Sequence, residues 1–598
     1  MADTDNLSRR RFLQATGGAA AAGALAGCTG DGGDTTTTTT TTTKEPENEL
    51  SLINSTIDTL DPIAAADTAS GRVIMQLFDA LTNYQDGTTT ITNLLTKGYE
   101  ISEDYKTYTF NLEENATFHN GDPVTASDVV YSFERLAGSS NSRRSSFILS
   151  TLGVKHETTS DGEYKSGSLA VTAVDEKTVK VELKSAFHAS LQMLAYSSFS
   201  VVPEGIVGDI PGYDGRVEYQ KWQANPSGTG SGPFQFDKWS SGTEARVTAY
   251  DDYYGAAPKV NSVHWQVIEN DNAHYNYAMN KNADMFGIPT AFYDPEKVSV
   301  ERETQKGQKL GTYGPLRNGE TANYVGVPTI NTYYIGFNME AVPKPVRKAV
   351  AYAMNQQMMV DRVFKGRGQA AYHFTPPSIY PGGADQYTQH AKEQYPYGYN
   401  ESRLDKAKQV MEEAGYSESE PYKLNWLQYT SDSWMEMAKI LRDQLASAHI
   451  DMQIEQATFN TLLTRVRNGN MEAFTLGWIA DWPAPDNFLA LLDPPQTQTD
   501  VPGGSSYINW SSKTGSAATQ AEQAYDVVQN NQKPTDADEK ARNEAYVKIE
   551  EANWEDVGML TVNHYIDEFF WYDTVADYTP FGGMGFSRQK LNDVVLND

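Results

Sequence analysis

Four successive segments in the last third of the chain alternate between helical and strand periodicity. Apolar residues recur at helical spacing over residues 434–445 and 459–466, and at every second position over 450–454 and 474–478. A helix–strand–helix–strand succession is typical of a sheet covered by helices. The chain is therefore predicted to be an α/β protein, with ligands expected near the end of the last strand.

That last strand runs into an acidic residue between two large aromatic residues. The sequence FTLGWIADWP at 474–483 places Asp481 between Trp478 and Trp482, and Pro483 stops further ladder pairing. A carboxylate walled by aromatic rings suits a cationic guest, which gains a charge-assisted hydrogen bond and the attraction of the ring faces. The alternative is that Asp481 caps a turn and both tryptophans are core residues.

The charge balance excludes some classes of partner. Lys and Arg number 48 and Asp and Glu number 78, so the net charge is −30. This balance argues against nucleic acid and against wide contact with anionic lipid. With 11% aromatic residues the chain is not of disordered composition, and we hypothesise a folded protein from a salt-loving source.

The N-terminus carries an export and anchoring pattern. The run SRRRFL and the Gly/Ala-rich stretch after it resemble a twin-arginine signal, which exports proteins already folded. The run LAGC ends at Cys28 and resembles a lipobox, which implies cleavage before Cys28 and its lipidation. Residues 1–27 are thus predicted to be the signal. Residues 28–47, with an unbroken threonine run over 35–43, are predicted to be a tether at the outer face of the cytoplasmic membrane.

No enzyme signature is present in the sequence. There is no Gly-x-Ser-x-Gly elbow, no His-Glu-x-x-His and no P-loop, and the 9 histidines lack ligand spacing. Cys28 is the single cysteine, which rules out a disulfide framework and a cysteine zinc site. We therefore expect no catalytic residues and no metal site, with a secreted glycosidase as the enzyme alternative.

Several separated motifs resemble the extracytoplasmic solute-binding proteins of peptide-type ABC importers, family 5. They occur in order over about residues 50–598, and include TLDP at 59–62, the stretch 118–135, GSGPF at 230–234, YIGFN at 334–338 and WIAD at 478–481. The resemblance implies a two-lobed, periplasmic-binding-protein-like α/β fold of type II. It implies the large peptide-binder class, with an extra sub-lobe and a hinge of two crossing segments.

By the same resemblance one lobe is discontinuous. We name the expected parts as follows: lobe I, residues 48–92, 200–332 and 556–598; the sub-lobe of lobe I, residues 93–199; lobe II, residues 333–555. Hinge crossings are then expected near Thr332 and near Gly558.

The resemblance also implies roles for individual residues. In family members that bind peptides, the aspartate of the Trp-x-x-Asp motif receives the free α-amine, and Asp481 occupies that position with Trp478 as the motif's aromatic residue. Trp482 is expected to be the second aromatic wall of the binding site. Ile57 is expected to give main-chain contacts to an extended peptide.

No single cation is identified for a peptide's C-terminus. The unranked candidates are Arg317, Arg367 and Lys365. The chain also departs from the family, with Thr56 where oligopeptide binders place an acid and Asn355 where a helix usually ends in aspartate.

The implied function is a membrane-tethered substrate-binding protein of an ABC importer. It captures di- or oligopeptides in a closing cleft and delivers them to the permease. Its partners are the solute, the permease and the ATPase subunits, and we expect a monomer without a cofactor. The alternatives are a non-peptide solute, such as a nickel complex or a sugar, and a surface sensor that uses the same cleft.

Overall fold

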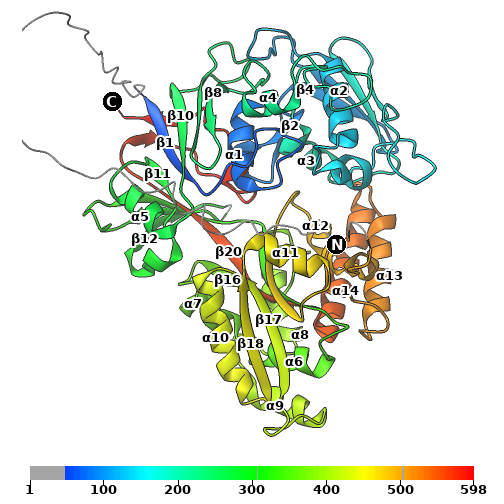
Figure 1. The fold of residues 1–598 in the computed structure, drawn as a ribbon, viewed down its shortest axis with the longest axis vertical. Coiled ribbons are helices and arrows are strands. Elements are labelled where there is room, and N and C mark those ends of the chain that lie inside the picture. The colour runs from blue at the N-terminus through cyan, green and yellow to red at the C-terminus, as the bar shows by residue number, and fades with distance from the viewer. Residues whose placement is uncertain (1–47, 306, 502–503, 598) are drawn as a thin grey trace, which may run out of the picture. The chain divides into compact units, whose positions relative to one another are not determined.

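The computed structural model describes residues 48–305, 307–501 and 504–597 (Figure 1). These residues belong to one compact unit, Pro46–Asp598. The predicted signal 1–27, the lipidation of Cys28 and the tether 28–47 lie outside the described residues. Within the described ranges, no helix combines the length and the apolar character that crossing a membrane requires.

A large mixed sheet dominates the fold, and it has fourteen strands among the described residues. Its main path runs in the order β18 (Ile450–Ala457), β17 (Tyr422–Tyr429), β19 (Ala473–Ile479), β15 (Asn331–Phe337), β20 (Met559–Trp571), β11 (Met285–Phe286), β1 (Glu49–Asn54), β10 (Ser262–Val267), β9 (Glu244–Ala249) and β8 (Phe234–Ser240). The strands beside this path are β12 (Val298–Glu303), β13 (Lys309–Tyr313), β14 (Ala322–Pro328) and β16 (Gly368–Ala370).

Smaller sheets and helices complete the body. The smaller sheets are β4 (Thr96–Ile101) with β5 (Thr107–Leu112), β7 (Thr178–Glu182) and β6 (Val171–Ala173); β2 (Thr82–Tyr84) with β3 (Ile91–Asn93); and β21 (Val575–Asp577) with β22 (Val595–Leu596). The α-helices are α1 (Thr68–Leu77), α2 (Ala126–Gly138), α3 (Ser190–Leu194), α4 (Tyr219–Ala224), α5 (Asp271–Met279), α6 (Lys344–Ala353), α7 (Gln356–Arg362), α8 (Gly383–Gln394), α9 (Leu404–Glu413), α10 (Asp432–Ala446), α11 (Phe459–Arg467), α12 (Pro485–Leu489), α13 (Ala518–Asn530) and α14 (Asp536–Asp556).

Strand β20 pairs with strands from two separate parts of the chain. Its first half pairs with β15 and β16, where Tyr333 lies opposite Asn563. Its second half pairs with β14 and β11, where Pro328 lies opposite Ile566 and Phe286 opposite Phe570. Figure 1 shows β20 passing from the strands around β16 to those around β11. One strand of 13 residues therefore connects the two halves of the sheet.

The hydrophobic core is divided in the same way. Trp426 and Val562 pack in a cluster made of lobe II and the first half of β20. Trp265 and Phe569 pack in a cluster made of lobe I and the second half of β20. A third cluster joins both lobes, since Tyr84 of lobe I packs in it with lobe II residues from β15 and β19. The parts of the chain expected to form lobe I and lobe II are thus in direct contact.

The structure confirms the α/β class and the succession of elements predicted for lobe II. Helices α10 and α11 alternate with strands β18 and β19 as the sequence periodicity indicates. Each helix begins with a side-chain cap, because Ser431 and Thr458 accept hydrogen bonds from the backbone N–H groups of Trp434 and Thr461. Helix α11 ends shortly before Gly469, whose φ of +70° suits glycine better than other residues.

Candidate functional site

Asp481 follows β19, and this strand is only partly paired. On one side β19 pairs with β15 along its whole length, up to Asn331 opposite Ile479. On the other side β17 pairs only with Ala473 and Phe474. From Thr475 onward, no strand among the described residues covers this edge of β19, and Ile479 is 51% exposed. The exposed end of β19, residues 477–479, therefore has an edge at which an added extended chain can pair.

The backbone around Asp481 is fixed by an asparagine from the next helix. The Asp481 backbone N–H donates to Asn487 Oδ1 at 3.0 Å, and Trp478 Nε1 donates to the same oxygen at 3.1 Å. Asn487 lies in α12 and is buried. Because one acceptor serves both donors, the position of the Asp481 carboxyl is coupled to that of the Trp478 ring.

The carboxyl of Asp481 is buried among two arginines and a tyrosine. Its residue is 8% exposed, and burial raises its pKa above the ordinary value for aspartate. Arg144 and Arg588 oppose this rise electrostatically, and hydrogen bonds from Asn487 and Tyr196 oppose it further. Asp481 is thus an acid in a low-dielectric site, with cations of the protein already near it.

The two arginines gather around the ring of Tyr196. The Arg588 Cζ atom lies 3.9 Å from the Tyr196 ring centroid, and the Arg144 Cζ atom lies 5.5 Å from it. Phe147 packs edge-on against Tyr196 with ring centroids 5.0 Å apart, which closes this side of the cluster. The aromatic ring beside Asp481 is therefore a tyrosine of the sub-lobe.

Trp482 packs against residues of the expected sub-lobe. It is 8% exposed and belongs to the hydrophobic cluster of the sub-lobe, where its ring meets Phe187 with centroids 5.8 Å apart. Its Nε1 donates to Asp486 at 3.2 Å, and Asp486 Oδ2 lies 2.9 Å from His188 Nε2 of the sub-lobe. Trp482 and Asp486 thus connect lobe II to the sub-lobe next to Asp481.

The remaining predicted site residues are placed as follows. Ile57 is 1% exposed with its side chain in the lobe I cluster, so only its main chain is available to a ligand. Arg367 is paired with Glu568 and donates to Ile288 O. Arg317 donates to an asparagine, and Lys365 donates to two carbonyl oxygens. Each of these three candidate cations already has a partner within the protein.

Sequence reasoning missed four residues around Asp481. They are Arg144, Tyr196, Asn487 and Arg588. Asn487 could have been found, since it lies in the helix directly after the motif. The other three come from distant parts of the chain, and no local pattern marks them.

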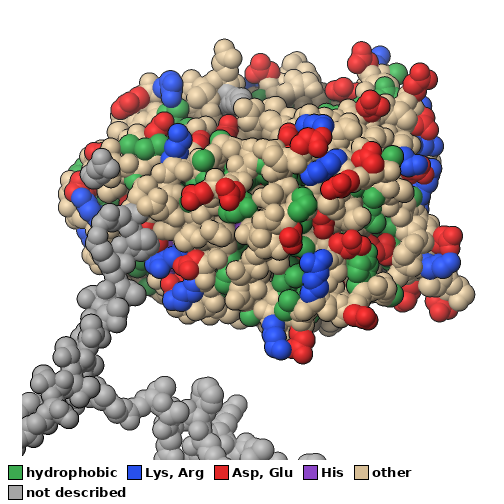
Figure 2. All heavy atoms as spheres, turned by 90° about the horizontal axis from the view of Figure 1, so that it is seen from above, with side chains coloured by type: hydrophobic (Ala, Val, Ile, Leu, Met, Phe, Trp, Pro, Cys, Tyr) green, Lys and Arg blue, Asp and Glu red, His purple; other side chains and the backbone are tan. Residues whose placement is uncertain are grey.

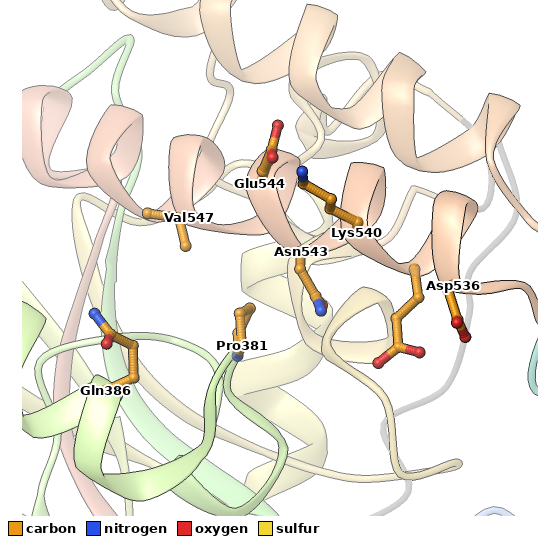
Figure 3. Close-up of a pocket in the computed structure, with 8 residues that line it drawn as sticks. Pro381, Gln386, Asp536, Lys540, Asn543, Glu544 and Val547 are labelled. Atoms are coloured by element: carbon orange, nitrogen blue, oxygen red, sulfur yellow. The ribbon is translucent and has the colours of Figure 1, made fainter.

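Other hollows on the surface do not include Asp481. One of about 510 Å³ lies between α14 and the turn at Pro381, and its lining includes Lys540, Glu544 and Val547 (Figure 3). Another of about 450 Å³ is lined by His188 and by residues 483–485, directly after Trp482. In the parts of the chain that the structure describes, no group of three or more His, Cys, Asp or Glu residues could hold a metal ion.

The surface charge is mixed as well as acidic. Figure 2 shows one face on which acidic side chains are spread among scattered Lys and Arg. No single basic patch is visible on this face.

Comparison with known proteins supplies the family. Residues 90–500 match the model for bacterial extracellular solute-binding proteins, family 5 middle. The chain is 25% identical over 465 residues to the oligopeptide-binding protein OppA of Bacillus subtilis, covering 76% of this chain and 77% of that one. It is 24% identical over 454 residues to the dipeptide-binding protein of Escherichia coli, covering 70% and 72%.

Solved structures share the fold. The murein tripeptide binding protein MppA of Escherichia coli has a TM-score of 0.70 at 21% identity, over 92% of this chain and 98% of that one. Haemophilus influenzae OppA in complex with the peptide RPPGFSPFR has a TM-score of 0.69 at 21% identity, over 92% and 99%. The predicted two-lobed fold is therefore confirmed.

Proposed function

Because the chain belongs to the extracellular solute-binding proteins of family 5, we propose that it captures peptides and passes them to the permease of an ABC importer. The observation that carries the proposal is the buried carboxyl of Asp481 beside the half-paired strand β19. The names of the relatives, an oligopeptide-binding and a dipeptide-binding protein, support a peptide as the solute.

The two features of the site suit the two constant parts of a peptide. The free α-amine is a cation, and Asp481 offers it an ionic hydrogen bond away from water. The extended main chain can pair with the exposed end of β19, at residues 477–479. Recognition through these parts leaves the peptide side chains free to vary.

Capture proceeds by closure of the two lobes. Trp482 and the Asp486–His188 pair connect lobe II to the sub-lobe, and these contacts form only when the lobes meet. The lobes turn about the segment between β14 and β15 and about the part of β20 that changes partners. A ligand that bridges the lobes shifts the population toward the closed form.

Export, membrane anchoring and oligomeric state are part of the same proposal. The chain is exported by the twin-arginine route and held at the outer face of the membrane by the lipid on Cys28. It acts as a monomer, without a cofactor and without catalysis, since ATP is hydrolysed by the ATPase subunits. The runner-up is the same role for a non-peptide solute, or a surface sensor that uses the same cleft.

The first test is to identify the native cargo. Protein purified from its native host is denatured, and the released small molecules are identified by mass spectrometry. We expect a set of short peptides with free α-amines. A single non-peptide solute would overturn the peptide assignment while leaving the family membership in place.

The binding of peptides should weaken on acidification. Burial raises the pKa of Asp481, so this carboxyl becomes neutral at a higher pH than an exposed aspartate and then stops attracting an ammonium group. Calorimetric affinity for Ala-Ala-Ala, measured from about pH 6.5, where the α-amine is charged, to about pH 4, should fall in the natural protein. It should stay nearly level in Asp481→Asn, and a parallel fall in both proteins would contradict the role of Asp481.

A further inference from the structure

The cluster around Asp481 holds several charged side chains. Two guanidinium groups, those of Arg144 and Arg588, lie near this one carboxylate. Arginine stays protonated in proteins, so both groups are charged at any relevant pH. Asp67 also acts on Arg144, and its carboxylate keeps its negative charge while it accepts the Ser70 N–H at 2.7 Å. A bound ammonium group therefore brings this cluster to three positive charges against the two carboxylates of Asp481 and Asp67.

Both arginines also keep unused hydrogen-bond donors. Arg588 is 5% exposed, and its guanidinium makes no hydrogen bond to any of the described residues. Arg144 donates from Nη2 to Ala66 O at 3.1 Å, while its buried Nε has no acceptor among the described residues. Buried donors without acceptors are unfavourable, and a charged donor without an acceptor more so.

The two arginines affect how a peptide's α-amine binds at Asp481. An α-amine that approaches Asp481 meets the attraction of one carboxylate and the repulsion of two guanidinium groups. A peptide that also brings a carboxylate removes the imbalance, because arginine binds carboxylate through two parallel N–H donors. The side chain of the first residue branches from the carbon that carries the α-amine, so it is the part of the peptide closest to these donors.

We propose that Arg144 and Arg588 form an anion subsite beside Asp481, which selects peptides whose first residue carries a side-chain carboxylate, glutamate or aspartate. The subsite rests on the proposed peptide-binding function and adds a preference to it. Asp481 holds the ammonium group and the two arginines hold the side-chain carboxylate. The Tyr196 ring, against which both arginines pack, keeps them in place.

The test compares tripeptides of equal length that differ in one group. Affinities of the full-length protein for Glu-Ala-Ala, Gln-Ala-Ala and Ala-Glu-Ala are measured by isothermal titration calorimetry. We expect Glu-Ala-Ala to bind at least about tenfold more tightly than Gln-Ala-Ala, as for one fully formed charge-assisted interaction. Ala-Glu-Ala should resemble Gln-Ala-Ala, because its carboxylate is on the second residue.

Variants assign the preference to the arginines. Arg144→Gln, at a half-buried position, and Arg588→Gln should each bring the Glu-Ala-Ala to Gln-Ala-Ala ratio close to one. The matched control is Arg442→Gln, which removes an exposed arginine bonded to Asp443 and should keep the full ratio. If Arg588→Gln does not fold, Arg144→Gln and the comparison of peptides on the natural protein still decide the question.

The outcomes separate the subsite from the proposed function. Equal affinity of the natural protein for all three peptides would overturn the anion subsite and leave peptide binding intact. Absence of binding for all three would overturn the proposed function itself, and the subsite with it. A preference for Glu-Ala-Ala that survives in both arginine variants would overturn the assignment to Arg144 and Arg588.

Discussion

Replacing Asp481 with asparagine is expected to weaken the binding of a peptide with a free α-amine by at least about tenfold. Removal of one partner of a buried charge pair typically costs about 3–5 kcal/mol, and each 1.4 kcal/mol is about tenfold in affinity. Asparagine keeps the size of the side chain and the backbone N–H bond to Asn487, so the loss reports the charge. Arg144 and Arg588 remain in the variant and add repulsion to the lost attraction.

Two controls make this result specific, with affinities measured by calorimetry. An N-acetylated peptide has no ammonium group, and it should bind the variant and the natural protein about equally. Asp493→Asn removes another buried carboxyl of lobe II, one whose pKa burial raises to about 7, and it should leave peptide affinity unchanged. Unchanged affinity in Asp481→Asn for the unblocked peptide would rule out the amine anchor.

Replacing Arg135 with methionine is expected to lower the free energy of unfolding by about 3–5 kcal/mol. The Arg135 side chain is 1% exposed and joins two acids, with Nη2 2.9 Å from Asp61 Oδ2 and Nε 2.8 Å from Asp209 Oδ1. Its Cζ atom also lies 5.1 Å from the centroid of the Trp222 ring. Methionine fills much of the volume but leaves two buried carboxylates without their cation.

Denaturant unfolding of the full chain measures this loss. The matched control is Lys97→Met, which breaks the Lys97–Glu114 pair whose side chains are 45% and 69% exposed. This control should shift the unfolding midpoint far less, and added salt should reduce the shift further. Because the Arg135 cluster is buried, its effect should persist in strong salt. Equal shifts for both variants would show that burial does not determine how much the Arg135 ion pairs contribute to the free energy of unfolding.

The elements of this fold could be predicted from the sequence where they follow local rules. The spacing of Thr125 and Asp128 predicts a capping box, and in the structure Asp128 Oδ2 accepts the Thr125 backbone N–H at 2.7 Å at the start of α2. Residues 169–183 alternate around a short polar turn, and they form the β6–β7 hairpin. These features depend on neighbours in the chain, which the sequence displays directly.

The surroundings of Asp481 could not be predicted in the same way. Arg144, Tyr196 and Arg588 come from the sub-lobe and from the last part of the chain, and only the folded body brings them together. Trp482 shows the same difficulty, since its place in the sequence suggests a wall of the site. In the structure its large apolar ring packs in the cluster around Phe187, where it is largely removed from water.

The sharing of β20 between the lobes sets an order on folding during synthesis. Strands β14 and β11 of lobe I precede lobe II in the chain, yet their partner β20 follows it. The lobe I sheet therefore stays incomplete, with exposed strand edges, until residues 559–571 have left the ribosome. A chain that begins to cross a membrane before that point would have to complete this sheet on the far side. Transport of the finished protein, as the twin-arginine pattern implies, lets both lobes close on β20 while the whole chain is still in one compartment.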